Sequence, residues 1–211
     1  MKSILLLLLF AFSVFGTNIP ILCYHRLSNT QQDSMTIKTD AFNQQMEWLK
    51  IHGYKPVSLA TALGILRNKT IVNYRPVVIT VDDGHQSVYT DMAPIIKKYH
   101  YPVTLFIYPS AISNAKYAMT WEELKALEKT GLFEVQSHTY WHPNFKKEKK
   151  HLSQFEYQQF VKKQLLGSKQ KLEEKMGHKI DYLAWVFGIY DTELEKEAKL
   201  YGYKAAFTIE R

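Results

Sequence analysis

An unbroken, largely β-branched run, residues 76–81 with the sequence PVVITV, limits the folds open to this chain more than any other feature. A strand that is covered on both faces has such a continuous apolar sequence, because neither of its faces is in contact with water. Strands of that kind lie in parallel sheets whose faces carry helices. The run therefore predicts a parallel α/β fold.

Short apolar runs alternate with amphipathic stretches over the rest of the chain. The other expected strands are residues 19–24, 103–107, 133–136, 182–187 and 205–209. The expected helices are residues 40–52, 58–67, 87–99, 121–129, 154–176 and 192–201. Strand–helix alternation implies a parallel sheet, open or closed into a barrel. Six strands without a linker or a break in composition predict one domain, a small, distorted (β/α) barrel.

The first 16 residues differ in composition from the rest. Lys2 precedes residues 4–15, of which only Ser13 is not apolar, and Val14 and Gly16 offer the short residues that a signal peptidase reads. As a helix, this apolar run would span about 18 Å, less than the ~30 Å hydrocarbon core of a membrane. We expect residues 1–16 to be a secretory signal peptide, and residues 17–211 to form a domain that is exported to the periplasm, the cell surface or the medium.

The chain carries 27 Lys and Arg against 20 Asp and Glu, a formal charge of +7. No nucleic-acid-binding motif accompanies these lysines, which are spread over the expected helices, so nucleic acid is not an expected partner. The densest basic run, residues 146–150 (KKEKK), is typical of a solvated loop and helix start. The alternative is electrostatic attraction to an anionic cell envelope. The single cysteine, Cys23, excludes an intramolecular disulfide, and the oligomeric state stays open.

Polar side chains gather where the expected strands end. His25 follows the first strand, Asp82 and Asp83 follow the buried run, and His138 and His142 follow residues 133–136. The carboxyl ends of parallel strands meet at one edge of the sheet, and that edge carries the site in such folds. We therefore expect two carboxylates and three imidazoles on one rim.

These residue types suit metal-assisted hydrolysis. His138 and His142 are four residues apart, so their rings can converge within about 5–6 Å, although two surface histidines are the alternative. Adjacent carboxylates at a strand end point in different directions, so one can bind a metal ion while the other accepts a proton. An Asp with two His suits Zn²⁺ or a similar divalent ion, which activates water and polarises an amide or ester carbonyl. His25 is the best-placed proton donor, its alternative being a hydrogen-bonded core histidine.

Two motifs resemble those of a known family. Residues 80–84 (TVDDG) are similar to the Thr-Phe-Asp-Asp-Gly motif of the polysaccharide deacetylase family, which has the NodB-homology fold of carbohydrate esterase family 4. Residues 137–142 (SHTYWH) match its Ser-His-Thr-x-x-His motif, and residues 93–107 resemble the helix and strand between the two. The resemblance runs from about Ile19 to the C-terminus.

The resemblance implies that Asp82 is the general base and that Asp83, His138 and His142 hold a divalent metal ion, Zn first, with Ni, Co or Fe as alternatives. Residues 184–190 (AWVFGIY) are similar to the segment that walls the family's site, and a backbone N–H near Phe187 is a candidate oxyanion donor.

Most members of this family place their catalytic histidine in a C-terminal Leu-x-His motif, which this chain lacks. The branch that deacetylates poly-β-1,6-N-acetylglucosamine in biofilms has a Tyr-His near its N-terminus instead, a circular rearrangement of the motif order, and residues 22–26 (LCYHR) and 42–59 are similar to it. On this resemblance His25 is the general acid. The alternative is a truncated or naturally short chain.

The resemblance implies a metal-dependent hydrolase that removes N-acetyl groups from N-acetylglucosamine units of a polysaccharide. Poly-β-1,6-N-acetylglucosamine is the expected substrate, with peptidoglycan or chitin-like oligomers second. The aromatic residues expected to contact the sugar rings are Tyr24, Tyr140, Trp141, Trp185, Phe187 and Tyr190, and ordinary packing at the edge of the core is the alternative. The alternatives are a catalytically silent sugar-binding module and an amidase or esterase for a small substrate.

Overall fold

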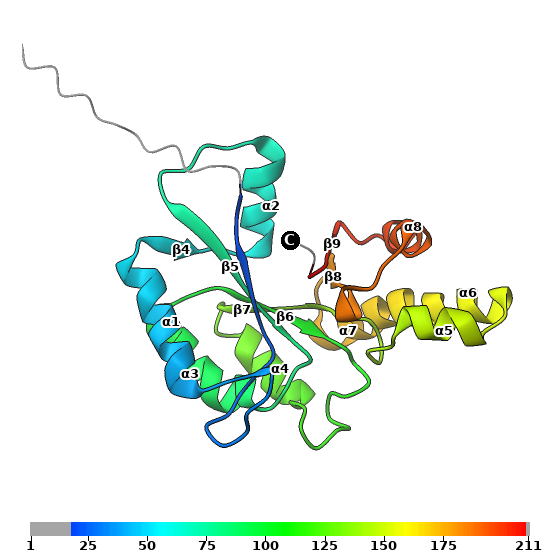
Figure 1. Cartoon of the computed structure of the whole chain (residues 1–211), viewed down its shortest axis with the longest axis horizontal. Helices are drawn as coiled ribbons and strands as arrows, with labels where there is room; N and C mark the ends of the chain where they lie inside the picture. Colours follow the sequence, from blue (N-terminus) through cyan, green and yellow to red (C-terminus); the bar gives the residue numbers. More distant parts are fainter. Residues whose placement is uncertain (1–17, 210–211) are drawn as a thin grey trace, which may run out of the picture.

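A computed structural model describes residues 18–209, so the expected signal peptide lies outside the described residues. These residues form a parallel sheet in the order β1–β5–β6–β7–β8–β9, with β4 also paired to β5 (Figure 1). The strands are β1 (Ile21–Tyr24), β4 (Tyr54–Pro56), β5 (Arg75–Asp82), β6 (Val103–Ile107), β7 (Phe133–Ser137), β8 (Tyr182–Ala184) and β9 (Ala205–Phe207). A separate two-stranded sheet pairs β2 (Arg26–Leu27) with β3 (Thr36–Ile37). The parallel α/β prediction is confirmed.

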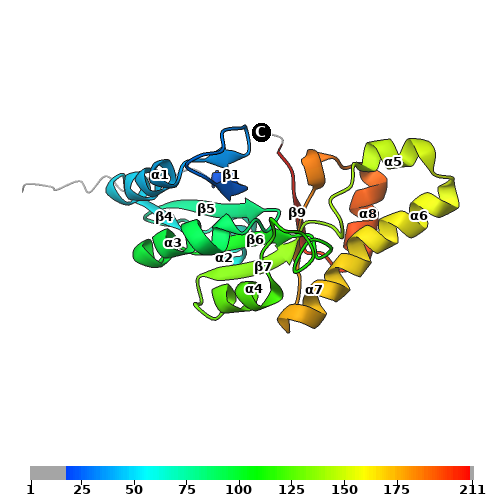
Figure 2. The same ribbon diagram turned by 90° about the horizontal axis from the view of Figure 1, so that it is seen from below.

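The helices gather in two groups at opposite ends of the sheet. On the side of β1 and β5 lie α1 (Thr39–Ile51), α2 (Leu59–Asn68) and α3 (Ala93–Tyr99), and α4 (Trp121–Glu128) packs against β7. Beside β8 and β9 lie α5 (Phe145–His151), α6 (Gln154–Lys162), α7 (Ser168–Met176) and α8 (Thr192–Leu200), as Figure 2 also shows. None of the helices in the described part of the chain is both long and apolar enough to cross a membrane.

The central strand β5 is buried on both faces, as its sequence predicts. Val77, Ile79 and Val81 belong to the large core under the outer helices. Val78 points the other way, into a smaller core with Leu59 of α2 and the strand residues Phe106 and Tyr182. Because side chains alternate along a strand, Thr80 and Asp82 lie on the same inner face as Val78.

The sheet curves into a half-barrel rather than a closed barrel. Within residues 18–209, β1 and β9 end the hydrogen-bonded path and do not pair with each other. A cleft of about 630 Å³ lies between them. Ile21 and Cys23 line this cleft on the β1 side, and Phe207 lines it on the β9 side. Asp82 also lines the cleft. The inner face of β5 is therefore reached from the open side of the half-barrel.

Several predicted boundaries are wrong for local reasons. The strand expected at residues 182–187 ends at Ala184, because a 3₁₀ turn, η3 (Val186–Gly188), follows with Phe187 at φ 54°. The helix expected at 154–176 is interrupted by a π-helical turn, η2 (Lys163–Gly167). The helix expected at 87–99 likewise begins with a π turn, η1 (Val88–Met92).

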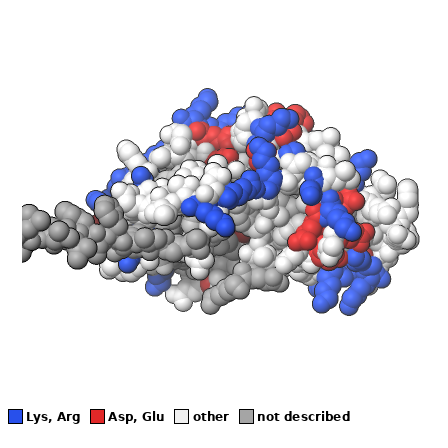
Figure 3. Space-filling view, turned by 90° about the horizontal axis from the view of Figure 1, so that it is seen from above, with Lys and Arg blue, Asp and Glu red and all other residues white. Residues whose placement is uncertain are grey.

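Positive charge is distributed over the surface. On the face in Figure 3, Lys and Arg lie in separate groups, several of them beside Asp or Glu. The basic run at residues 146–150 forms most of α5, and its Lys149 pairs with Asp191 (2.9 Å) and Glu193 (2.8 Å) near the start of α8. This run therefore helps to join two helices.

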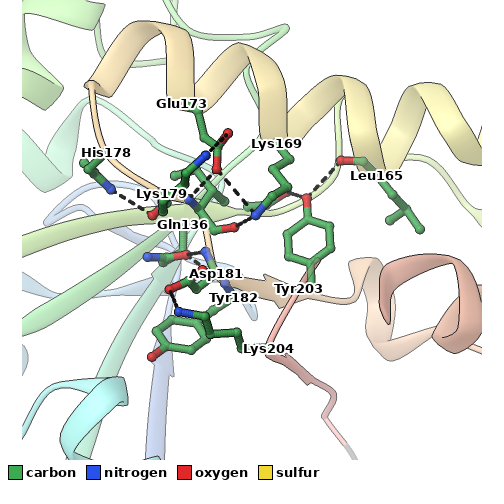
Figure 4. Close-up of polar contacts among 12 residues, drawn as sticks. Gln136, Leu165, Lys169, Glu173, His178, Lys179, Asp181, Tyr182, Tyr203 and Lys204 are labelled. Carbon is green, nitrogen blue, oxygen red and sulfur yellow. Dashed lines mark hydrogen bonds and ion pairs between the residues drawn. The ribbon is translucent and has the colours of Figure 1, made fainter. Parts of the chain in front are cut away.

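A network of polar contacts holds the last two strands in place (Figure 4). Only one register pair, Ser137 with Leu183, joins β7 to β8. The buried side chain of Gln136 adds to this junction, because its Oε1 accepts hydrogen bonds from the backbone N–H groups of Asp181 (2.9 Å) and Tyr182 (2.8 Å). The Tyr203 hydroxyl, at the start of the β9 segment, donates to Leu165 O at 2.9 Å.

We predict that Gln136→Leu lowers the free energy of unfolding by about 2–5 kcal/mol, because two backbone donors lose their partner. The matched control is Gln158→Leu, since Gln158 is exposed on α6. Urea unfolding followed by circular dichroism measures both variants. Equal stability of the two would show that the Gln136 contacts do not hold β8.

Candidate active site

The expected site residues lie together at the carboxyl ends of three strands. His25 directly follows β1, Asp82 is the last residue of β5 with Asp83 after it, and His138 directly follows β7. His142 lies in the loop beyond His138. Parallel pairing of β1 with β5, and of β5 through β6 to β7, brings these segments to one rim.

Three residues of the candidate site have strained backbone. Asp83 (φ 74°), Thr139 (φ 67°) and His142 (φ 64°) all adopt the left-handed region, which a β-branched residue such as Thr139 rarely enters. Such outliers gather at functional sites, where the surrounding structure holds them. At Gly84 (φ 74°) a Cβ atom would lie 3.0 Å from the Cδ1 atoms of Ile107 and Ile112, so the turn after Asp83 requires glycine.

Asp83, His138 and His142 converge on one point. Asp83 Oδ1 lies 3.7 Å from His138 Nε2 and 3.4 Å from His142 Nε2. His138 Nδ1 lies 2.9 Å from Ala184 O, so Nδ1 carries the proton and the Nε2 lone pair faces Asp83. Asp83 Oδ1 is buried and accepts no hydrogen bond from the described residues. A carboxylate oxygen and two imidazole nitrogens around an unsatisfied centre fit a divalent cation.

Electrostatics favours a cation over a simple ion pair here. Burial lowers the pKa of His138, and burial together with the nearby His138 lowers the pKa of His142. Both imidazoles are therefore neutral near pH 7, which is the form that binds metals. The charge of Asp83 is then left for a metal ion to balance.

Asp82 has a different environment from its neighbour. Its side chain is only 9% exposed, and burial raises the pKa of its carboxyl group to about 7, which suits a general base. The Cys23 Sγ–H donates to Asp82 Oδ2 at 3.4 Å, while Asp82 Oδ1 has no partner within residues 18–209. Three potential ligand atoms, one each from Cys23, His25 and Asp82, lie within 4.8 Å of one another.

Two supporting residues were not predicted from the sequence. Gln164, fully buried on η2, accepts at Oε1 from the backbone N–H groups of Tyr140 (3.1 Å) and Trp141 (3.2 Å). The Ser168 hydroxyl donates to Thr139 O at 2.8 Å. Together they hold the loop between His138 and His142. The sequence pattern that could have identified them is a polar residue on the apolar face of a helix.

One family model matches most of the chain. It is described as polysaccharide deacetylase and matches residues 69–206. The chain belongs to the polysaccharide deacetylase family. The family expected from the two motifs is therefore confirmed.

Curated relatives in this family carry a more specific name. The poly-β-1,6-N-acetyl-D-glucosamine N-deacetylase of Staphylococcus aureus (strain MRSA252) is 27% identical over 191 residues, covering 89% of this chain and 66% of that protein. The Escherichia coli (strain K12) protein of the same name is 23% identical, covering 89% of this chain and 33% of that protein. The chain thus spans only part of these relatives' length.

A solved structure agrees with the fold. The IcaB structure from Ammonifex degensii has a TM-score of 0.81 and 25% identity, and the match covers 92% of this chain and 85% of that one. The half-barrel of parallel strands with outer helices is therefore the fold of this family of deacetylases.

The six aromatic residues expected to contact the sugar rings differ in exposure and contacts. Trp141, Phe187 and Tyr190 are exposed by 44%, 57% and 37%, and the Phe187 ring lies 4.8 Å from that of His142. Trp185 is 4% exposed and packs against Phe145, and it lines the cleft of about 630 Å³ that also holds Asp82.

The remaining two aromatic residues contact protein groups. Tyr140 lies under Lys163 Nζ, 3.8 Å from the ring centroid. Tyr24 donates to Gln45 Oε1 and lines a separate cleft between β1 and α1. Tyr108, which was not predicted, lies 5.3 Å from the His142 ring.

We predict that His138→Gln weakens binding of the first equivalent of Zn²⁺ about 100-fold or more, because one of three ligands is lost. Competition against a chromogenic chelator at one equivalent of Zn²⁺ measures this. The control is His151→Gln, an exposed histidine at the end of α5. Unchanged affinity in His138→Gln would place the metal elsewhere.

Proposed function

We propose that this chain is a metal-dependent N-deacetylase of an N-acetylglucosamine polysaccharide, with poly-β-1,6-N-acetylglucosamine as the first substrate to test. The observation that carries the proposal is the convergence of Asp83, His138 and His142 beside the buried Asp82. The names of the relatives support the substrate, as does the position of His25 after β1.

In this proposal each site residue has a separate role in amide hydrolysis. A divalent cation held by Asp83, His138 and His142 would lower the pKa of water and polarise the acetyl carbonyl. Asp82 accepts the proton of the attacking water, and its unpartnered Oδ1 is available for this. His25 donates a proton to the departing amine. Water and the N-acetyl group are thereby converted to acetate and a free amino group.

The surroundings suit a sugar substrate with a small acyl group. A cavity of about 220 Å³ borders His25, Asp83 and Tyr108, which gives room for the acetyl group. Trp141 and Phe187 expose aromatic faces on the same rim. Such faces can stack on sugar rings, which present apolar C–H surfaces.

We also propose that Zn²⁺ is the resident metal and that the protein is exported. Nitrogen and oxygen ligands in this number suit Zn²⁺, and Ni, Co and Fe are the alternatives. The composition of residues 1–16 supports export. Electrostatic association with an anionic envelope remains a proposal that rests on the net charge of +7.

The test is acetate release from acetylated β-1,6-glucosamine oligomers by the Zn²⁺-loaded protein. We expect Asp82→Asn to lower kcat about 10²- to 10⁴-fold, because the amide cannot accept the proton. Asp40→Asn, an exposed change on α1, is the matched control. Oligomer binding without acetate release by the wild-type protein would identify a silent sugar-binding module instead.

The pH dependence follows from the buried base. Burial raises the pKa of Asp82 to about 7, and a cation at Asp83 shifts it downward because positive charge favours the carboxylate. The base works only when deprotonated, so we expect kcat/KM to fall as pH falls through a pKa at or below about 7. Initial rates at saturating Zn²⁺ across this range measure it. A rate that rises on acidification would contradict the assignment.

A further inference from the structure

A second group of metal-ligating side chains stands beside the metal triad. Cys23 on β1, His25 just after it and Asp82 at the end of β5 bring their ligating atoms within 4.8 Å of one another. Register fixes this arrangement, because β1 pairs in parallel with β5 and Cys23 lies opposite Thr80. The group shares no residue with Asp83, His138 and His142.

The donor set suits Zn²⁺. Thiolate, imidazole and carboxylate are the three ligand types that zinc takes in proteins, at about 2.0–2.3 Å. Ligands around a tetrahedral Zn²⁺ therefore lie roughly 3.5 Å apart. Cys23 Sγ and Asp82 Oδ2 are already separated by 3.4 Å. The proton that they share occupies the place that a metal ion would take.

The burial of Asp82 also favours a cation beside its carboxylate. The residue is 9% exposed, and its Oδ1 atom accepts no hydrogen bond from the described residues. A buried carboxylate oxygen without a donor is costly unless a proton or a cation satisfies it. The cleft between β1 and β9 reaches both Cys23 and Asp82, so an ion with a water as fourth ligand can enter.

We propose that Cys23, His25 and Asp82 form a second, inhibitory Zn²⁺ site. Binding replaces the Cys23 thiol proton, forms a bond from Zn²⁺ to Sγ and releases one proton to solvent. It also occupies Asp82 and His25 together, so water loses its proton acceptor and the amine loses its proton donor. The inhibitory consequence rests on the proposed deacetylase function, whereas the binding itself does not.

The order of filling follows from the ligands. In the triad, His138 Nε2 and His142 Nε2 lie 3.7 and 3.4 Å from Asp83 Oδ1, with no hydrogen-bonded proton between these atoms. At the second site the Cys23 thiol donates its proton to Asp82 Oδ2 at 3.4 Å, so Zn²⁺ must displace that proton before it can bind. The second site is therefore the weaker one, and it fills only when zinc is in excess.

Binding can be tested without activity by titrating the metal-free protein with Co²⁺. The chain has one cysteine, so a sulfur-to-cobalt charge-transfer band in the near ultraviolet reports Cys23 alone. We expect the first equivalent to give no such band and the second to produce it. Cys23→Ser should bind one equivalent and show no band. Absence of the band in the wild-type protein at every Co²⁺ concentration would overturn the proposal.

Inhibition is tested by acetate release as Zn²⁺ is raised past one equivalent. We expect the wild-type rate to reach a maximum and then fall, while Cys23→Ser needs about tenfold more zinc or higher for the same relative loss. Serine keeps a hydroxyl donor for Asp82 but is a poor zinc ligand, which makes it the matched variant. Each rate is divided by that variant's own rate at one equivalent.

The outcomes separate the two proposals. Equal zinc inhibition of both proteins, or a charge-transfer band without inhibition, would overturn the inhibitory site. Absence of acetate release at every zinc concentration would refute the deacetylase function, and the cobalt titration would still decide whether the site exists. Mg²⁺, which prefers oxygen ligands, is the control ion and should not inhibit.

Discussion

The burial of β5 on both faces is the constraint on which the rest of the structure depends. Residues Val77, Ile79 and Val81 must meet the outer helices, which leaves the alternate positions, ending with Asp82, on the inner face of the half-barrel. A shift by one residue would exchange the two sets and turn Asp82 outward. The proposed base is therefore positioned by the packing of hydrophobic neighbours.

The same constraint places two adjacent carboxylates in different environments. Asp82 is held in a buried environment that stabilises its protonated form, whereas Asp83 leaves the strand through a left-handed turn and meets two imidazoles. Pairs of titratable groups with divergent environments are typical of sites that need one base and one ligand. The turn requires Gly84, so backbone geometry and chemistry depend on the same three residues.

Much of this could be predicted from the sequence, because local patterns encode it. Unbroken apolar runs located β5 and β6, and the strand ends predicted that Asp82, Asp83 and His138 share one rim. The π turns could not be predicted, since their sequences read as ordinary helix. The burial of Trp185 and the contacts of Gln164 depend on partners far along the chain, which no local pattern specifies.

The hydrogen bond from His138 Nδ1 to Ala184 O links the proposed metal triad to the folding of the C-terminal third of the chain. It fixes the imidazole tautomer, but it forms only when β8 is docked, and β8 is joined to β7 by one register pair and by Gln136. A ligand that binds only the docked state stabilises that state by mass action. Metal binding and the docking of β8 are thus thermodynamically coupled, and each stabilises the other.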